Sequence, residues 1–381
     1  MGKTYLDNHI LSSHYIIDGV RYDVPPLALI DENAEILDVT GDIVDESREP
    51  SLAAVRYHSE KIAEYANAVR MGAPSGRPFN MVWPEHASRM VVASALIDMI
   101  WIDGHMRLGD LCACLNWVWE TSSVGNMSGF YRCVDSVCSY LYDLGVAVSG
   151  YHVAECNDVS RFTAQIGLCS RADDEDADNE DSLLFKKSPY ESRHPHLSGD
   201  RRCASKAAGD CDNWLIYIPF DPCSFKLGDS LLAYISNDNS GAAPNISDPD
   251  YFIDCYEVVR ELVEDGIITA GVTVSQGGLS LAFDAICHDC SLVADLSGIM
   301  ASYGETDLIK ILFSEIPGVL IEISDENFDY FDSQMILQDV AYYPVGHPVT
   351  GGSGIEYTSD GKAGLGDILS SLMGQASEGE D

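Results

Sequence analysis

The sequence predicts an α/β protein in two parts, and three observations support this fold class. Stretches with the apolar period of a helix alternate with short runs of apolar and β-branched residues, as on either side of Gly266. A double glycine, Gly277 and Gly278, separates such a run from the next helical stretch. A strongly acidic stretch at 173–181 divides the chain. Helices and strands on both sides of it indicate two packed units.

The first half is expected to contain a hairpin followed by helices and strands. Residues 15–22 predict a β-hairpin around Asp18 and Gly19, because Asp-Gly favours the tight turn between two strands. The elements expected after it are helices at 51–72, 84–102 and 129–144, followed by strands at 146–148 and 162–168.

The middle of the chain is expected to be a loop. Residues 173–181 are nearly all acidic, so they cannot bury apolar surface. Coil is predicted to continue to about residue 212, and this stretch is the expected boundary between the two units.

The second half begins again with a strand and alternates with helices. A helical pattern ends at Gly266, and glycine suits the left-handed position that closes a helix. The strands expected here lie at 214–218, 230–235, 270–274 and 319–323. The tail from residue 346 is expected to be loose, with a short helix within 365–373.

Charge excludes several classes of partner. The chain has 61 acidic and 22 basic side chains, which gives a formal net charge of −39. A surface of this sign repels phosphate backbones and anionic lipid, so we expect neither nucleic-acid binding nor membrane binding. Adaptation to salt and an acidic bias of the source proteome both explain such acidity, and neither bears on chemistry.

The compartment expected is the cytoplasm. The beginning of the chain lacks a basic segment followed by an apolar core, and no apolar run approaches 18 residues. Most of the 12 cysteines stand in apolar runs, which favours free buried thiols in a reducing compartment over disulfides.

The double-glycine bend is the first candidate site. A strand, a glycine turn and a helix in succession let backbone N–H groups approach a phosphate. Ser275 adds a hydroxyl to the bend formed by Gly277 and Gly278.

Asp98 is the second candidate, because it stands on an otherwise apolar helix. A carboxylate is costly to bury unless it is paired or bound to a metal ion. The alternative is a helix face that is turned to water.

Three cysteine groups resemble metal sites but have simpler explanations. His194, His196, Cys203 and Cys211 could hold zinc, although their irregular spacing favours a solvated linker. The pair Cys287–Cys290 follows a helix and lacks a second pair of ligands, which favours packing. Cys112 and Cys114 face one side of an expected buried strand, which also favours packing.

Two tryptophans beside Asn116 suggest either base stacking or a core. Trp117 and Trp119 alternate along an expected strand. Alternating aromatic residues on a strand more often fill a core than bind a base.

Six blocks of residues together resemble one family. The order of these blocks is similar to that in the second half of phosphoribosylformylglycinamidine synthase, the purine-pathway amidoligase, which belongs with the aminoimidazole ribonucleotide synthetase-like ATP-binding proteins. The resemblance extends over about residues 15–345, and its blocks lie at 94–101, 116–119, 144–150, 227–233, 275–279 and 312–319.

The resemblance implies a domain organisation. It gives a synthetase-like N-type unit and a C-type unit, preceded by a linker with a hairpin. The boundaries are a linker segment at 1–50, the N-type domain at 51–172, an acidic loop at 173–211, the C-type domain at 212–345 and a flexible tail at 346–381.

The resemblance also shows which site residues are kept. The family writes the bend as His-Asp-x-Ser-Asp-Gly-Gly-Leu, and here its two acids fall on Thr273 and Gln276. The family's magnesium-binding glutamate and asparagine correspond to Ser94 and Asp98. Magnesium prefers carboxylate and phosphate oxygens.

The expected ligand set is therefore small. Asp98 would bind the metal ion, and Ser275, Gly277 and Gly278 would contact ATP or ADP.

The function that the resemblance implies is a structural or regulatory part of the synthase with little catalysis alone. The family reaction is an ATP-dependent amidation, and the lost acids fit the half that carries an auxiliary nucleotide. Two alternatives are a non-catalytic scaffold that binds no ligand and a stand-alone ATP-dependent enzyme of the same superfamily. The expected partners are a second copy, a chain carrying the first half, and a glutaminase subunit.

Overall fold

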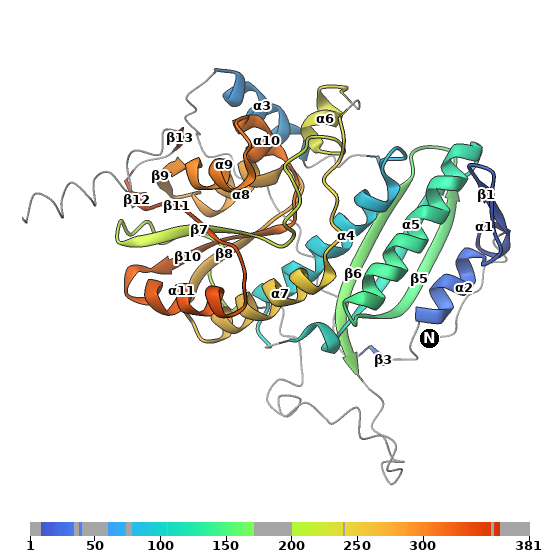
Figure 1. Ribbon diagram of the computed structural model, residues 1–381, viewed down its shortest axis with the longest axis horizontal. Helices are drawn as coiled ribbons and strands as arrows, with labels where there is room; N and C mark the ends of the chain where they lie inside the picture. The colour runs from blue at the N-terminus through green and yellow to red at the C-terminus, as the bar shows by residue number, and fades with distance from the viewer. Residues whose placement is uncertain are drawn as a thin grey trace, which may run out of the picture.

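The computed structural model describes residues 9–33, 38–39, 60–73, 78–104, 106–170, 200–238, 241–351 and 354–358. Two four-stranded sheets, each with helices packed on it, lie side by side (Figure 1). The helix predicted at 51–72 is described from residue 60. The expected acidic loop at 173–181, the tail helix at 365–373, and His194 and His196 lie outside the described residues.

A hairpin opens the described chain, as the sequence predicts. Strands β1 (Tyr15–Ile17) and β2 (Val20–Tyr22) pair antiparallel. Asp18 has φ 53° and Gly19 has φ 79°, which is the pair of positive φ angles that a type I′ turn requires. The short helices α1 (His9–Ser12) and α2 (Pro26–Asn33) flank the hairpin.

The first sheet has the strand order β3-β6-β4-β5. Strand β4 is parallel to β5 and antiparallel to β6. The bounds are β3 (Asp38–Val39), β4 (Leu111–Glu120), β5 (Ala147–Cys156) and β6 (Arg161–Ser170). The strands predicted at 146–148 and 162–168 are confirmed, and both are longer than predicted.

Two helices cover one face of this sheet (Figure 1). Helix α4 (Pro84–Asp98) continues into a 3₁₀ turn, η2 (Met99–Trp101), and a second 3₁₀ turn, η3 (Leu108–Asp110), precedes β4. Helix α5 (Val124–Asp143) starts five residues before the predicted position at 129. The earlier start shows that Gly125 and Gly129 are tolerated inside the helix, because its apolar face packs on the sheet.

The second sheet has the order β11-β7-β10-β8 and is antiparallel throughout. Its strands are β7 (Asn213–Pro219), β8 (Ile268–Val274), β10 (Gly318–Ser324) and β11 (Tyr343–Gly346). Helices α7 (Pro249–Glu264) and α11 (Phe328–Leu337), the latter preceded by the 3₁₀ turn η5 (Asp325–Asn327), cover one face. Helices α8 (Gly278–Ile286), α9 (Ser297–Tyr303) and α10 (Leu308–Phe313) cover the other.

Residues 231–235 form helix α6 (Leu231–Ile235), so the strand predicted at 230–235 is wrong. The Ser230 side chain accepts a hydrogen bond from the Ala233 amide at 3.1 Å and caps the helix. Helix α7 ends as predicted, because Gly266 has φ 73° directly after it.

The expected loose tail is wrong for residues 348–350 and 354–358. These form β12 (Pro348–Thr350) and β13 (Gly354–Thr358), which pair with the two edges of β9 (Cys290–Asp295). Tyr357 of β13 is fully buried against Phe283 of α8, which anchors this stretch to the second unit.

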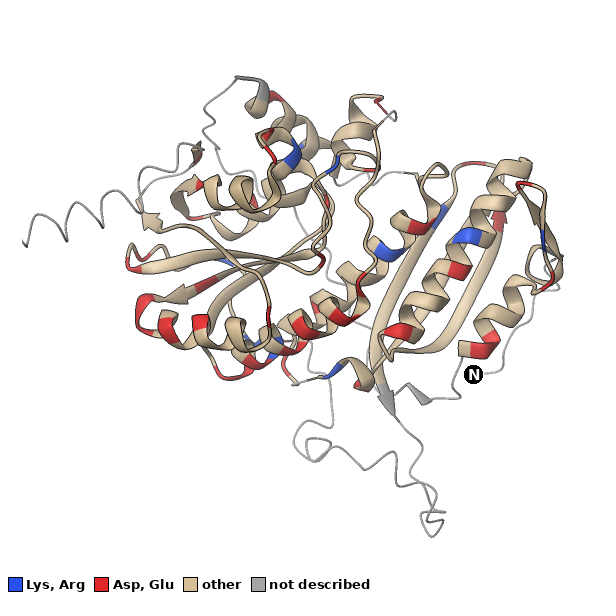
Figure 2. Cartoon of the chain, in the orientation of Figure 1, with Lys and Arg blue, Asp and Glu red and all other residues tan. Residues whose placement is uncertain are grey.

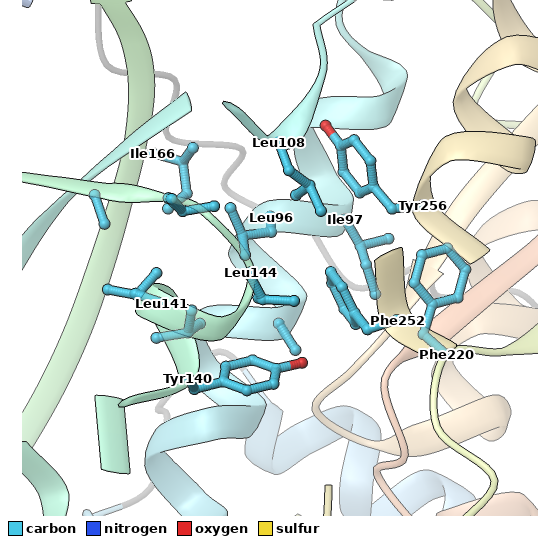
Figure 3. Packing of buried hydrophobic residues seen from close by; sticks show 14 of the residues in the cluster. Leu96, Ile97, Leu108, Tyr140, Leu141, Leu144, Ile166, Phe220, Phe252 and Tyr256 are labelled. Atoms are coloured by element: carbon cyan, nitrogen blue, oxygen red, sulfur yellow. The ribbon is translucent and has the colours of Figure 1, made fainter. Parts of the chain in front are cut away.

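One hydrophobic core continues from the first sheet to the second. Figure 3 shows side chains of α4, α5 and α7 in a single cluster. The ring of Phe252 on α7 lies 6.0 Å from that of Tyr140 on α5 and 5.4 Å from that of Phe220. The two units are therefore packed together through apolar surface.

Acidic residues are frequent along α7 and α11 (Figure 2). In the part of the chain that the structure describes, no helix has the length and apolar character needed to cross a membrane.

Helix α3 (Glu60–Gly72) precedes α4 in the chain but packs on the second unit, against α6 and α8. Residues 200–208 also contact that unit, where Ala204 pairs with Ala270 on the outer edge of β8. The coil expected up to residue 212 is thus ordered against the sheet from residue 200 onwards.

Candidate functional site

The glycine bend lies inside the second unit, between β8 and α8. Gly277 and Gly278 are buried, whereas Ser275 and Gln276 are half-buried. Gly277 has φ 83° and Gly278 has φ 64°, which is backbone that favours glycine. The Gly278 amide donates to the Ser275 carbonyl at 2.8 Å. The predicted strand–bend–helix geometry is therefore present.

Close packing explains why residue 278 is glycine. A Cβ at this position would lie 2.6 Å from the Ser314 carbonyl oxygen and 2.7 Å from that of Leu312. The bend thus rests directly on the backbone at the end of α10. This contact by itself requires glycine at residue 278, whether or not a ligand binds at the bend.

Glu315 closes the bend from inside the protein. Its Oε1 accepts a hydrogen bond from the Gly277 amide at 2.7 Å and another from the Leu231 amide at 2.7 Å. The residue is 1% exposed. Both glycine amides therefore have acceptors within the protein, and a phosphate at this bend has to displace the Glu315 carboxylate.

Glu315 lies in the block at 312–319 that resembles the family, but its role at the bend was not predicted. A carboxylate that follows an apolar helix gives no signal of its partners, which lie 38 and 84 residues away.

Asp98 lies beside the strand that leads into the bend. Thr273, the penultimate residue of β8, donates from Oγ1 to Asp98 Oδ1 at 2.5 Å. Trp101 Nε1 donates to the same threonine hydroxyl at 2.8 Å. Of the two explanations weighed for Asp98, the structure supports a paired carboxylate.

This arrangement explains one departure from the family pattern. Thr273 occupies the position of a family acid, and a carboxylate there would face Asp98 directly. Two ionised carboxylates so close repel each other unless a cation or a shared proton lies between them. With threonine, the position is satisfied by hydrogen bonds, so Asp98 is left as a single carboxylate and fits poorly to a magnesium shell.

The other positions compared with the family are dispersed. Ser94 lies one turn before Asp98 on α4 and is half-buried, as is Gln276 on the bend. Val272 stands where the family's bend has its histidine, and it belongs to the second core. Tyr151 of β5 stands in the place of the family's Gly-Lys-Asp-Ser block and packs against the first core. The structure thus brings Asp98 and Ser275 to one end of β8 but leaves Tyr151 with the first sheet.

The cysteine groups lie in packing positions. Cys112, Cys203, Cys287 and Cys290 are buried, and Cys211 is exposed. Within the described ranges, one group of metal-ligand type appears, Asp210 with Cys211 and Asp212, and all three are exposed.

The aromatic pair on β4 also fills a core. Trp117 and Trp119 are both fully buried, and each packs edge-on against Phe130 of α5. Asn116 points to the opposite face of the sheet, where its Oδ1 lies 3.0 Å from His152 Nδ1.

A buried ion pair holds α3 next to the bend. Arg70 donates from Nε to Asp284 Oδ2 on α8 at 2.8 Å, and Nη2 also bonds to this oxygen. Burial raises the pKa of Asp284 to about 6, and the Arg70 guanidinium opposes this rise. Val69 lies over Gly277, where a Cβ would come within 3.1 Å of its methyl group.

Curated relatives of the chain carry the name of one family. No protein-family model matches the chain. The chain is 25% identical over 289 residues to "Probable phosphoribosylformylglycinamidine synthase, chloroplastic/mitochondrial" of Arabidopsis thaliana, which covers 76% of the chain and 19% of the plant protein. It is 31% identical over 105 residues to "Phosphoribosylformylglycinamidine synthase subunit PurL" of Methanocaldococcus jannaschii, covering 27% of the chain and 14% of the archaeal subunit. The aligned part is thus less than a quarter of either relative.

A solved structure shows the same fold. The chain superposes on T. maritima PurL complexed with FGAR with a TM-score of 0.53 and 11% identity, covering 74% of this chain and 43% of that one. The fold is therefore the α/β fold of PurL, and the resemblance inferred from the six blocks is confirmed.

Proposed function

We propose, from the similarity to phosphoribosylformylglycinamidine synthase and the PurL fold, that the chain is a structural or regulatory part of such a synthase, with little catalysis alone. The observation that carries this proposal is the bend itself. Its shape is kept, but Glu315 takes the Gly277 amide and the matched acids are replaced by Thr273 and Gln276.

The lost acids matter because the reaction handles ATP. Phosphate transfer needs positioning and a cation that neutralises the charge on the phosphates. Asp98 is the one carboxylate kept among the matched positions, and its Oδ1 already accepts a bond from Thr273. We therefore assign catalysis to another chain or another half of the assembly.

The auxiliary ligand that we propose is ATP or ADP with Mg²⁺. The Ser275 hydroxyl and the bend at Gly277 and Gly278 would contact its phosphates. Asp98 would be the one matched carboxylate left to bind the metal ion, so the phosphates themselves would have to complete the magnesium shell. A scaffold without a ligand is the second candidate, and the bonds from both glycine amides to internal acceptors favour it.

Isothermal titration calorimetry with ADP and with MgATP separates these two candidates. Heat that is lost in Ser275→Ala and Asp98→Ala, but kept in the exposed control Asp143→Ala, supports the ligand-holding part. No heat at millimolar nucleotide supports the scaffold. Binding that survives both site variants contradicts the site.

The proposed partner is a second copy or a chain carrying the first half of the synthase. On the first sheet, most side chains that alternate with the core residues are half-buried or exposed, including Asn116, His152 and Thr163, whereas Cys112 is buried. The archaeal relative is named as a subunit, which supports assembly with other chains. A glutaminase subunit is the further partner that we propose. Sedimentation velocity tests this, and monomers alone and in the mixture would contradict it.

We also propose a cytoplasmic location for this part. The eleven cysteines whose side chains the structure describes are free thiols, which suits a reducing compartment.

A further inference from the structure

Cys287 and Cys290 stand at the two ends of one tight turn. Cys287 follows the last residue of α8, and Cys290 is the first residue of β9. The Cys290 amide donates to the Cys287 carbonyl at 3.4 Å, which closes the turn. Residues so joined have Cα atoms within about 7 Å. A disulfide spans about 4.4–6.8 Å between Cα atoms, so the backbone suits a cross-link.

The two thiols already contact each other. The Cys287 thiol donates a hydrogen bond to the Cys290 sulfur, which lowers the pKa of Cys290. This bond and burial raise the pKa of Cys287. For Cys133 and Cys138, by contrast, burial raises the pKa of both thiols. Cys290 is therefore the better nucleophile, with Cys287 beside it as the second thiol.

The cover over this pair is thin. Cys287 is 2% exposed and Cys290 is 1% exposed. The side chains between them are open to solvent, however, because His288 is 42% exposed and Asp289 is 65% exposed. Lys206 bonds to Asp289 at 3.2 Å, and exposed pairs of this kind contribute little stability. A local opening of the turn admits a small oxidant.

We propose that Cys287 and Cys290 form a reversible dithiol–disulfide site that reacts with hydrogen peroxide. The Cys290 sulfur attacks one peroxide oxygen, so an S–O bond forms, the O–O bond breaks and hydroxide leaves. The Cys287 sulfur then attacks the sulfenic acid, so the S–S bond forms and the S–O bond breaks. The thiol protons join the two leaving hydroxides, and peroxide is reduced to two waters.

This site lies on the helix that carries the glycine bend. Helix α8 begins at Gly278 and ends one residue before Cys287. Oxidation therefore fixes the far end of α8 to the first residue of β9, independently of any nucleotide.

Peptide mass spectrometry tests the proposal on the full chain. The native protein is treated with hydrogen peroxide, denatured, alkylated and digested, and the exposed Cys211 serves as the internal measure of oxidation. We expect a peptide that has lost two hydrogens and carries no alkyl group on Cys287 or Cys290. Dithiothreitol should restore alkylation of both.

Variants make the test specific. Cys290→Ser should abolish the disulfide, and Cys287→Ser should stop at a sulfenic acid that dimedone traps on Cys290. Cys138→Ser is the matched buried control and should leave the disulfide intact. The proposal is overturned if Cys211 is oxidised while Cys287 and Cys290 stay fully alkylated, or if they oxidise without joining.

Discussion

At the scale of single residues, the bend is determined by what lies behind it. Gly278 sits against the backbone of residues 312–314, and Glu315 accepts the amide of Gly277. Both contacts are internal and together account for the double glycine as a packing feature. Gly277 and Gly278 are also the residues that made the bend resemble a phosphate site in the sequence.

Gly278→Ala should lower the free energy of unfolding by about 3 kcal/mol or more. The added Cβ would meet the Ser314 carbonyl at 2.6 Å, in addition to the strain of φ 64°. Gly304→Ala is the matched control, because its φ is 60° and no atom lies within 4 Å of the added Cβ. Gly304→Ala should lower the free energy of unfolding by about 1 kcal/mol. Equal losses in urea denaturation would show that the close contact does not matter.

Glu315→Leu should cost about 2–5 kcal/mol, because it leaves two buried amides, those of Gly277 and Leu231, without an acceptor. Glu315→Gln keeps an acceptor oxygen and should lose clearly less. The exposed Glu326→Leu is the control and should change stability by about 0.5 kcal/mol or less. If both Glu315 variants match this control, the carboxylate does not hold the bend.

At the scale of elements, the buried ion pair of Arg70 with Asp284 adds to the apolar contacts that join α3 to the second unit. Folding raises the pKa of Asp284 from 3.8 to about 6, so the folded state favours the protonated carboxyl. Its contribution to stability is therefore full below pH 3.8 and is lost as the pH rises through 6. Without Arg70, the pKa of Asp284 in the folded state rises further. The stability that the protonated carboxyl contributes is then lost at a higher pH.

Arg70→Met should thus lower the free energy of unfolding by about 3 kcal/mol at pH 7.5 and by clearly less at pH 5. Arg132→Met breaks an exposed pair with Asp18 and should cost less than about 1 kcal/mol at either pH. Denaturation curves at the two pH values measure both variants. A loss in Arg70→Met that is the same at both pH values would contradict the role of Asp284.

The elements that could be predicted from the sequence are those with a turn residue or a helix-ending residue at their boundary. Asp18-Gly19 closes the hairpin, and Gly266 ends α7, because each residue sets the local backbone. Helix α6 was missed because five residues are too few to show a period, although Ser230 is a local N-cap signal at its start. At the site, Asp98 and the bend were found by pattern. Glu315 and the Arg70–Asp284 pair were not, since their partners are distant in the sequence.

At the scale of the whole molecule, the two units share one core, while part of the first sheet remains open to solvent. The aligned part covers 19% of the plant relative and 14% of the archaeal one. A chain with this fold, one retained carboxylate and a bend filled by its own glutamate is suited to support an assembly. Under this proposal, catalysis by the assembly depends on another chain or another half, because the matched positions of this chain lack the family's acids.

The most direct test of this account is phosphate release by the isolated chain, measured with MgATP, formylglycinamide ribonucleotide and ammonia. We expect no release above the rate without protein, and no change in Asp98→Ala. Sustained release that depends on the ribonucleotide and disappears in Asp98→Ala would contradict the account, because the chain would then be an enzyme by itself.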